Sequence, residues 1–150
     1  MKKKLFYLTA AALFALDRLT KCLWADKSFT LIPHVLSVSG TQNTGMAFGL
    51  LSGKALPLAL AAALVLCGIF WYMKTHSLSR LETLGFGLLA GGALGNLFDR
   101  LVYGHVIDML EPLFIDFFIF NIADAGITVG AVLLGAAILF GKEDAKDGAA

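Results

Sequence analysis

The chain has 150 residues, of which 58% are hydrophobic and only 15% are charged, and its mean hydropathy is +0.79. A soluble domain is usually close to half apolar and a quarter charged, so this composition predicts an integral membrane protein with one domain, residues 1–150. The formal net charge is only +1, which gives no basic footprint for a nucleic-acid partner.

Four apolar segments approach the roughly 20 helical residues that are needed to cross a bilayer. They cover residues 5–23, 55–73, 81–98 and 117–140. If the N-terminus is cytoplasmic, the cytoplasmic segments hold seven basic residues, whereas the two outer loops hold only Lys27 and Lys54. Because basic residues favour the cytoplasmic side, the sequence predicts an all-α membrane protein with four transmembrane helices and both termini in the cytoplasm.

The connections between these segments differ in character. The first outer loop, residues 25–54, is too apolar for a solvated linker and too interrupted for a span, so we expect a small β-rich cradle at the membrane surface. The short connection 74–80 makes the second and third spans an antiparallel hairpin. The second outer stretch, residues 101–116, is expected to be irregular. The tail, residues 141–150, combines mixed charge with small residues and is expected to be disordered.

Glycines recur every four residues in two of the predicted spans. The third span contains Gly87, Gly91 and Gly95, and the fourth contains Gly126 and Gly130. Small residues at this spacing allow helix backbones to approach closely in lipid. We therefore expect the third and fourth spans to pack tightly and to bring their polar residues together.

Two acids stand out by their surroundings. Asp124 lies in the apolar stretch 117–140, where an unpaired carboxylate is costly and marks a candidate functional site. An alternative is a capped helix that begins near Ile122, with Asn121 as N-cap and Asp124 in the first turn. Asp108 lies between apolar neighbours and is either a second site residue or a solvated loop acid. Two acids at one membrane boundary favour acid–base chemistry.

Other polar residues gather near the predicted outer ends of the spans. Asn96, Asp99 and Arg100 share one helix face, since they are three and four residues apart. They form either a polar site or an interfacial helix end. Asp17 and Lys21 have i,i+4 spacing, which is typical of an intrahelical ion pair that lowers the cost of insertion.

Metal, phosphate and disulfide sites receive little support. The three histidines, His34, His76 and His105, are scattered along the chain, so no zinc site is predicted. Cys22 and Cys67 lie at different depths of separate spans, and a disulfide between them is not expected. We expect no metal ion and no cofactor.

Five motifs, in order along the chain, resemble the bacterial lipoprotein signal peptidase family, which is also called signal peptidase II. They are Asp17-x-x-x-Lys21, Asn43-x-Gly45-x-Ala47-Phe48, Gly95-Asn96-x-x-Asp99-Arg100, Val106-x-Asp108 and Phe120-Asn121-x-Ala123-Asp124. Each motif is weak by itself, but five in register over nearly the whole chain are specific. The chain length and the number of predicted spans are also similar to those of the family.

The resemblance implies an aspartic endopeptidase whose catalytic pair is Asp108 and Asp124. It further implies that the remaining motif residues bind substrate or support the site; these are Asn43, Gly45, Asn96, Asp99, Arg100, Asn121, Ala123, Asp17 and Lys21. One departure is Ala125, where many members of the family have serine directly after the second aspartate. This departure removes a possible serine hydrogen bond and leaves the acid pair unchanged.

The resemblance also implies a substrate, a location and an inhibitor. The substrate is a diacylglyceryl prolipoprotein, which is cut just before its lipidated cysteine to release the signal peptide. The enzyme is a multi-pass protein of the bacterial cytoplasmic (inner) membrane, in contact with membrane lipid, and its active site is toward the outer face. Globomycin, a cyclic peptide, is the expected inhibitor.

Two other classes of protein can carry the same acids. A small polytopic transporter or proton-relay subunit needs acids at several depths of the membrane. A scaffold needs a cation for each acid, such as Arg100 or Lys21. A hydrolase needs two acids that face each other across a water molecule.

Overall fold

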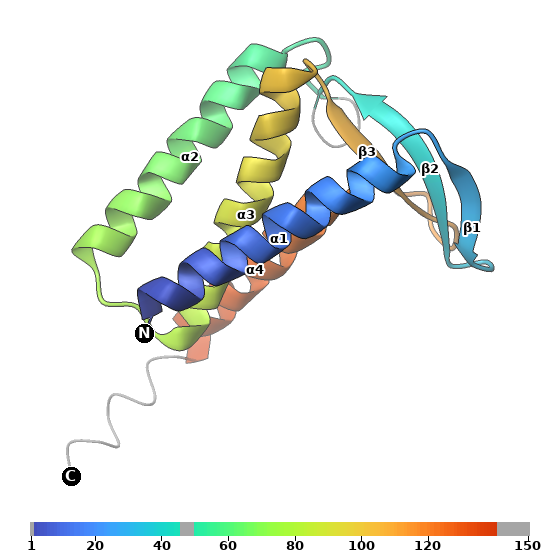
Figure 1. Cartoon of the computed structure of the whole chain (residues 1–150). Helices are drawn as coiled ribbons and strands as arrows, with labels where there is room; N and C mark the ends of the chain where they lie inside the picture. The colour runs from blue at the N-terminus through green and yellow to red at the C-terminus, as the bar shows by residue number, and fades with distance from the viewer. Residues whose placement is uncertain (1, 46–49, 141–150) are drawn as a thin grey trace.

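The structure is a computed structural model that describes residues 2–45 and 50–140. Its elements in chain order are α1 (Lys2–Trp24), β1 (Ser28–Ile32), β2 (Leu36–Asn43), α2 (Ala55–Thr75), α3 (Arg80–Val102), β3 (Val106–Pro112) and α4 (Ile122–Phe140). The start of α1 and the end of α4 lie at one end of the helices, and the sheet lies at the other (Figure 1). The predicted mainly helical fold is confirmed, and the β-rich first outer loop contributes β1 and β2 to a three-stranded sheet, whose third strand, β3, comes from outside that loop.

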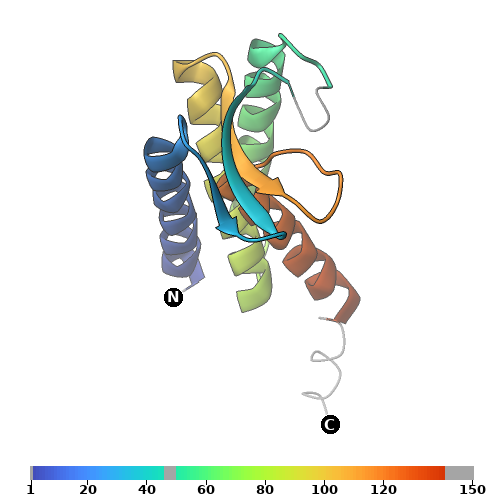
Figure 2. The same cartoon turned by 90° about the vertical axis from the view of Figure 1, so that its right-hand side faces the viewer.

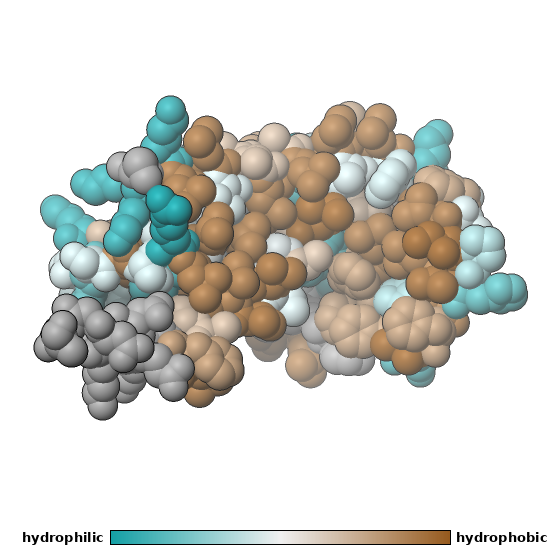
Figure 3. Space-filling view, turned by 90° about the horizontal axis from the view of Figure 1, so that it is seen from below, coloured by the Kyte–Doolittle hydropathy of each residue, from teal (hydrophilic) through white to brown (hydrophobic). Residues whose placement is uncertain are grey.

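Three of the described helices, α2, α3 and α4, are long and apolar enough to cross a membrane. Apolar residues cover the middle of the face in Figure 3, and hydrophilic residues lie toward both ends, as a bilayer requires. The first helix is also long, with 23 residues. It is not among these three, and it carries six charged residues: Lys2, Lys3, Lys4, Asp17, Arg18 and Lys21.

The central helix is α3, which packs against α1, α2 and α4 and makes its most extensive contacts with α4 and α1. Glycines on two of its faces permit these contacts. A Cβ atom at Gly92 would lie 2.4 Å from the carbonyl oxygen of Ala123 in α4, and one at Gly91 would lie 2.6 Å from that of Ala10 in α1. Neither position can accept a larger side chain without moving a neighbouring backbone.

The regular glycine repeat of α3 faces a different helix from the one predicted. Gly87 and Gly91 approach Thr9 and Ala10 of α1, whereas Gly85 and Gly92 approach α4. In α4, Gly126 packs against Leu13 of α1 and Gly130 against the backbone of Gly85. The predicted close packing of α3 and α4 is therefore confirmed, but most glycines of the four-residue repeats contact α1, because spacing alone does not say which helix covers a face.

The sheet has the order β1-β2-β3 with both pairs antiparallel. The expectation that residues 101–116 are irregular is therefore wrong for 101–102, where α3 continues, and for 106–112, which form β3, whereas residues 103–105 and 113–116 are irregular as expected. Val38 and Met109 are fully buried between the sheet and the helices. Figure 2 looks onto the sheet and shows the strands lying over the helices, with α1 on one side and α4 on the other.

The helix boundaries differ from the prediction mainly at α3 and α4. A capping box of Ser79 and Glu82 starts α3, and the helix extends past residue 98 because Asp99 and Arg100 find partners inside the fold. The fourth helix does not include residues 117–121, since the backbone of Phe120 pairs with Leu110 of β3. The predicted tail, 141–150, and motif residues Ala47 and Phe48 lie outside the described residues.

We expect Gly92→Ala to lower the free energy of unfolding by about 1–3 kcal/mol, because the added methyl group meets the backbone of α4. The measurement is unfolding in detergent micelles followed by far-UV circular dichroism. The control is Gly68→Ala in α2, where a Cβ atom meets nothing within 4 Å. Alanine there is expected to be neutral or to stabilise by up to about 1 kcal/mol; equal destabilisation by both variants would contradict the packing explanation.

Candidate active site

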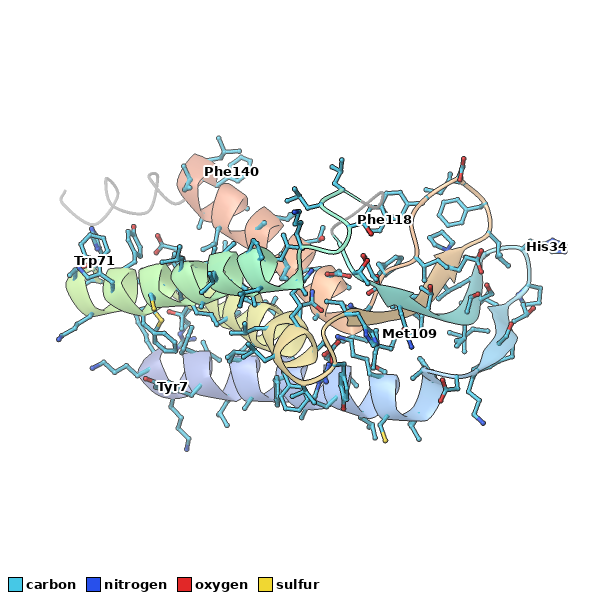
Figure 4. The ribbon with its side chains drawn as sticks, turned by 90° about the horizontal axis from the view of Figure 1, so that it is seen from above. Tyr7, His34, Trp71, Met109, Phe118 and Phe140 are labelled. Atoms are coloured by element: carbon cyan, nitrogen blue, oxygen red, sulfur yellow. The ribbon has the colours of Figure 1, made fainter. Side chains whose placement is uncertain are left out.

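A cavity of about 270 Å³ lies where α3 and α4 meet the sheet. It is lined by Asn43, Arg100, Val106, Asp108, Phe118, Asp124, Ile127 and Thr128. Figure 4 shows Phe118 near the sheet, far from Tyr7 and Trp71 at the opposite end of the molecule. The two acids singled out in the sequence thus line one cavity, although sixteen residues separate them.

Asp108 lies on β3 and is only 2% exposed. Its Oδ2 accepts a hydrogen bond of 2.9 Å from the Asn43 amide, and its Oδ1 accepts one of 2.7 Å from the Asn121 amide. Burial raises the pKa of Asp108 to about 6, and the nearby charge of Asp124 acts in the same direction. The alternative of a solvated loop acid is therefore wrong.

Asp124 lies in the first turn of α4, as the capped-helix interpretation predicts. Its backbone N–H donates to Asn121 Oδ1 at 2.9 Å, and its Oδ2 accepts from the Asn121 N–H at 3.2 Å. Its other oxygen, Oδ1, accepts a hydrogen bond of 2.7 Å from the Asn96 amide. The cap does not exclude a site, because the same carboxylate caps the helix and lines the cavity.

Asn121 connects the two acids and is fully buried. Its side-chain amide donates to Asp108 Oδ1, to Asn96 Oδ1 at 3.1 Å and to the carbonyl of Ile107 at 3.3 Å. Its backbone N–H and its Oδ1 are both bound to Asp124. One asparagine therefore fixes both carboxyl groups relative to the start of α4.

Arg100 and Gly45 link α3 to the segment after β2. The Arg100 guanidinium donates to the Gly45 carbonyl at 2.9 Å, and the Gly45 N–H donates to Asn43 Oδ1 at 2.9 Å. A Cβ atom at Gly45 would lie 2.4 Å from the carbonyl oxygen of Leu50, so only glycine fits without a shift. These contacts hold the Asn43 amide toward Asp108.

Asp99 is not part of the acid pair and belongs to a separate ion cluster with α1. Lys21 Nζ lies 3.0 Å from Asp17 and 2.7 Å from Asp99, and Arg18 lies 2.7 Å and 2.6 Å from the same carboxylates. The predicted pair of Asp17 and Lys21 is confirmed. Arg18 was missed because it stands at an unassigned position of the Asp17-x-x-x-Lys21 motif and its second partner, Asp99, is 81 residues away in the chain.

The histidines and cysteines, which all lie in the described part of the chain, do not form a metal site, although Cys22 and His105 line a common cavity. Within the described residues, no group of three or more His, Cys, Asp or Glu side chains is arranged to hold a metal ion. His34 lies at the tip of the turn between β1 and β2 (Figure 4). Cys22 and Cys67 are not paired with each other, and both are exposed.

Two carboxyl groups joined by amides at one cavity, in a helical protein with an apolar belt, are features of an aspartic-type membrane peptidase. Comparison with known proteins agrees with this class. The family described as Signal peptidase (SPase) II matches residues 9–140. The chain belongs to the signal peptidase II family.

Relatives and solved structures extend over most of the chain. A lipoprotein signal peptidase of Nostoc punctiforme is 39% identical over 143 residues, which is 89% of either chain. One from Streptococcus pyogenes serotype M1 is 38% identical over 141 residues, 89% of this chain and 92% of the relative. Two structures of a bacterial membrane enzyme obtained by the in meso method are 32% identical, with TM-scores of 0.85 and 0.82. The match to the first covers 89% of this chain and 87% of the solved chain. The match to the second covers 90% of this chain and 92% of the solved chain.

Titration of the free protein tests the electrostatics of the pair. We expect the Asp108 carboxyl to be protonated below and ionised above a midpoint near pH 6, followed by carbon-13 NMR of selectively labelled aspartate. In Asp124→Asn the midpoint is expected to fall, because a negative charge that opposes ionisation is removed. An unchanged midpoint would mean that the two acids do not interact.

Proposed function

We propose that this protein is an aspartic endopeptidase that removes the signal peptide from diacylglyceryl prolipoproteins, cutting just before the lipidated cysteine. The observation that carries the proposal is the placing of Asp108 and Asp124 on one cavity, with Asn121 bonded to both. Membership of the signal peptidase II family and relatives named lipoprotein signal peptidase support the choice of substrate.

The proposed reaction uses a single proton shared by the two acids. Two nearby carboxyl groups do not both ionise readily, so one is protonated and the other is ionised. The ionised acid takes a proton from a water molecule, whose oxygen attacks the scissile carbonyl carbon. The protonated acid donates to the carbonyl oxygen. The tetrahedral intermediate then breaks its C–N bond, a carboxyl proton passes to the leaving amine, and a hydroxyl proton of the intermediate returns to the other carboxylate, which restores the shared proton.

The surrounding amides are proposed to orient the two carboxyl groups without fixing either of them in the ionised form. In the described residues, the hydrogen bonds to Asp108 and Asp124 come from asparagine side chains and one backbone N–H. An amide orients a carboxyl oxygen without supplying a full positive charge, so either acid can still exchange a proton. This separates the pair from the scaffold alternative, which fits Asp17 and Asp99 with their own cations.

The location of the cavity fits an amphipathic substrate. It lies at the sheet end of the helices, and exposed apolar side chains of Leu113, Phe114 and Ile115 lie on the neighbouring connection between β3 and α4. A signal helix and acyl chains held in lipid would present the scissile bond at this depth. The acids lie at one end of the bundle, which favours a hydrolase over a proton relay with acids at several depths.

We further propose that α1 is a fourth span within the single domain, residues 1–150, and that the site faces outward from the bacterial cytoplasmic membrane with both termini inside. The ion cluster with α3 compensates Asp17, Arg18 and Lys21 and so lowers the cost of placing α1 in lipid. Globomycin is proposed to inhibit the enzyme, and no cofactor takes part.

The catalytic proposal predicts that Asp108→Asn and Asp124→Asn each lower the rate of signal-peptide release by about 10³-fold or more, because each removes one proton-transfer group. The assay is cleavage of a diacylglyceryl prolipoprotein by purified enzyme in lipid. Asp116→Asn is the matched control, because this exposed acid lies on the connection between the two residues. Its rate is expected to stay within about twofold of the unaltered enzyme.

Either acid variant with a near-normal rate, in a sample shown to be folded and inserted, would contradict the assignment of the pair. Complete inactivity of the unaltered enzyme on an authentic substrate would contradict the proposed substrate. Globomycin is added in a parallel reaction and is expected to block release.

The membrane topology is tested with single cysteines in a chain in which Cys22 and Cys67 are replaced by alanine. We expect His34→Cys to react with a membrane-impermeant thiol reagent from outside intact cells, and Ser77→Cys and Lys3→Cys to react only after lysis. Residues 34 and 77 flank α2, so they must lie on opposite sides. Labelling of Lys3→Cys from outside would show that α1 does not span.

A further inference from the structure

Four charged residues of α1 and α3, namely Asp17, Arg18, Lys21 and Asp99, form an ion cluster next to the proposed catalytic pair. Asp17, Asp99 and Lys21 are no more than 2% exposed, and Arg18 bonds both acids. Two cations face two anions, so the cluster has no formal net charge. Burying charges is expensive even when they are paired, which raises the question of what this arrangement does that apolar packing would not.

The two carboxylates of the cluster also bind the backbone at two particular residues. Asp99 Oδ2 accepts a hydrogen bond of 3.2 Å from the N–H of Ile107, which directly precedes Asp108. Asp17 Oδ1 accepts one of 3.1 Å from the N–H of Ala123, which directly precedes Asp124. The same cluster thus holds the backbone N–H of the residue before each acid of the pair, on β3 and on α4.

A third connection runs through Lys21. Its ammonium group donates to Asn96 Oδ1 at 3.2 Å, and the amide of Asn96 donates to Asp124 Oδ1 at 2.7 Å. The lysine therefore orients the Asn96 side chain. Its amide N–H₂ group, and not its carbonyl oxygen, faces the Asp124 carboxylate. Charge neutralisation alone would need neither this contact nor the two backbone contacts.

We propose that the cluster of Asp17, Arg18, Lys21 and Asp99 is a positioning device that sets the separation and orientation of the two catalytic carboxyl groups. This inference rests on the proposed function, in which Asp108 and Asp124 are the catalytic pair. Arg18 and Lys21 act through Asp17 and Asp99, which in turn hold the main chain on either side of the cavity. All four are positioning residues, and none of them lies on the reacting atoms.

Arg18 is the most informative position for a test, because its guanidinium links Asp17 to Asp99. These are the two acids that accept hydrogen bonds from the backbone next to the catalytic pair. It donates from Nη1 to Asp99 Oδ1 at 2.6 Å and from Nη2 to Asp17 Oδ2 at 2.7 Å. Lys21 also contacts both carboxylates, but without this fork of two guanidinium hydrogen bonds each carboxylate keeps only this one cation and can rotate away from its N–H partner. A displacement near 1 Å at a catalytic group lowers the rate by about 10²-fold.

The experiment compares kcat and KM for Arg18→Gln, Arg18→Lys and Arg80→Gln on a diacylglyceryl prolipoprotein in lipid. Arg80→Gln is the matched control, since Arg80 is exposed at the other end of α3. We expect Arg18→Gln to lower kcat by about 10- to 100-fold with KM within about twofold. Arg18→Lys keeps the charge without the fork and is expected to have an intermediate kcat, whereas the control is expected to match the unaltered enzyme.

A merely structural role would give a different pattern. Arg18→Gln would then lower the amount of folded protein or its unfolding temperature, while the folded fraction kept an unaltered kcat, and this result would overturn the proposal. If Arg18→Gln does not fold, Arg18→Lys decides, because an unaltered kcat in that variant also overturns it. A rise in KM alone would assign Arg18 to substrate binding and would overturn positioning as well.

The acid variants measured in the same preparations separate the two proposals. If Asp108→Asn and Asp124→Asn are inactive but both Arg18 variants have an unaltered kcat, the peptidase assignment is supported and the positioning role of the cluster is rejected. If either acid variant remains active, the catalytic pair is misassigned and both proposals fall.

Discussion

The structure depends on one constraint, which is that buried and half-buried acids at the end of a membrane helix bundle need defined partners. Four aspartates are packed where α1, α3 and α4 meet the sheet, and each has a distinct set of donors. Two of them, Asp17 and Asp99, form ion pairs with an arginine and a lysine, which stabilise their ionised forms. The other two, Asp108 and Asp124, accept hydrogen bonds from asparagine amides and remain able to exchange a proton. The division of partners, rather than the acids themselves, separates supporting residues from proposed catalytic ones.

The central position of α3 makes this division possible. Glycines on two faces let α1 and α4 approach its backbone, so side chains from three helices reach one another at its last turns. Asn96 faces Asp124 on α4, Asp99 faces α1, and Arg100 reaches the segment after β2. A bulkier helix in this position would hold its neighbours too far apart for hydrogen bonds of 2.7 Å.

Much of this arrangement was predictable from local sequence. Hydrophobic length located the helices to within a few residues, and the cap at Asn121 followed from the residue types around Asp124. Strand β3 was not predictable, because its seven residues gain their order from pairing with β2 and from burying Met109. Arg18 was also missed, since its role depends on Asp99, which is 81 residues away in the chain. Contacts between distant segments decide these features, and helical periodicity does not report them.

The double use of Asn121 restricts which residues can replace it. Helix capping alone would accept serine, threonine or aspartate nearly as well as asparagine, because each has a side-chain oxygen for the backbone N–H. This position must also donate an N–H to Asp108 Oδ1 while its own oxygen is occupied by Asp124. Aspartate has no such donor, and a hydroxyl is too short to serve both acids. The identity of the residue is thus set by chemistry at the cavity, while folding of α4 by itself would leave the choice open.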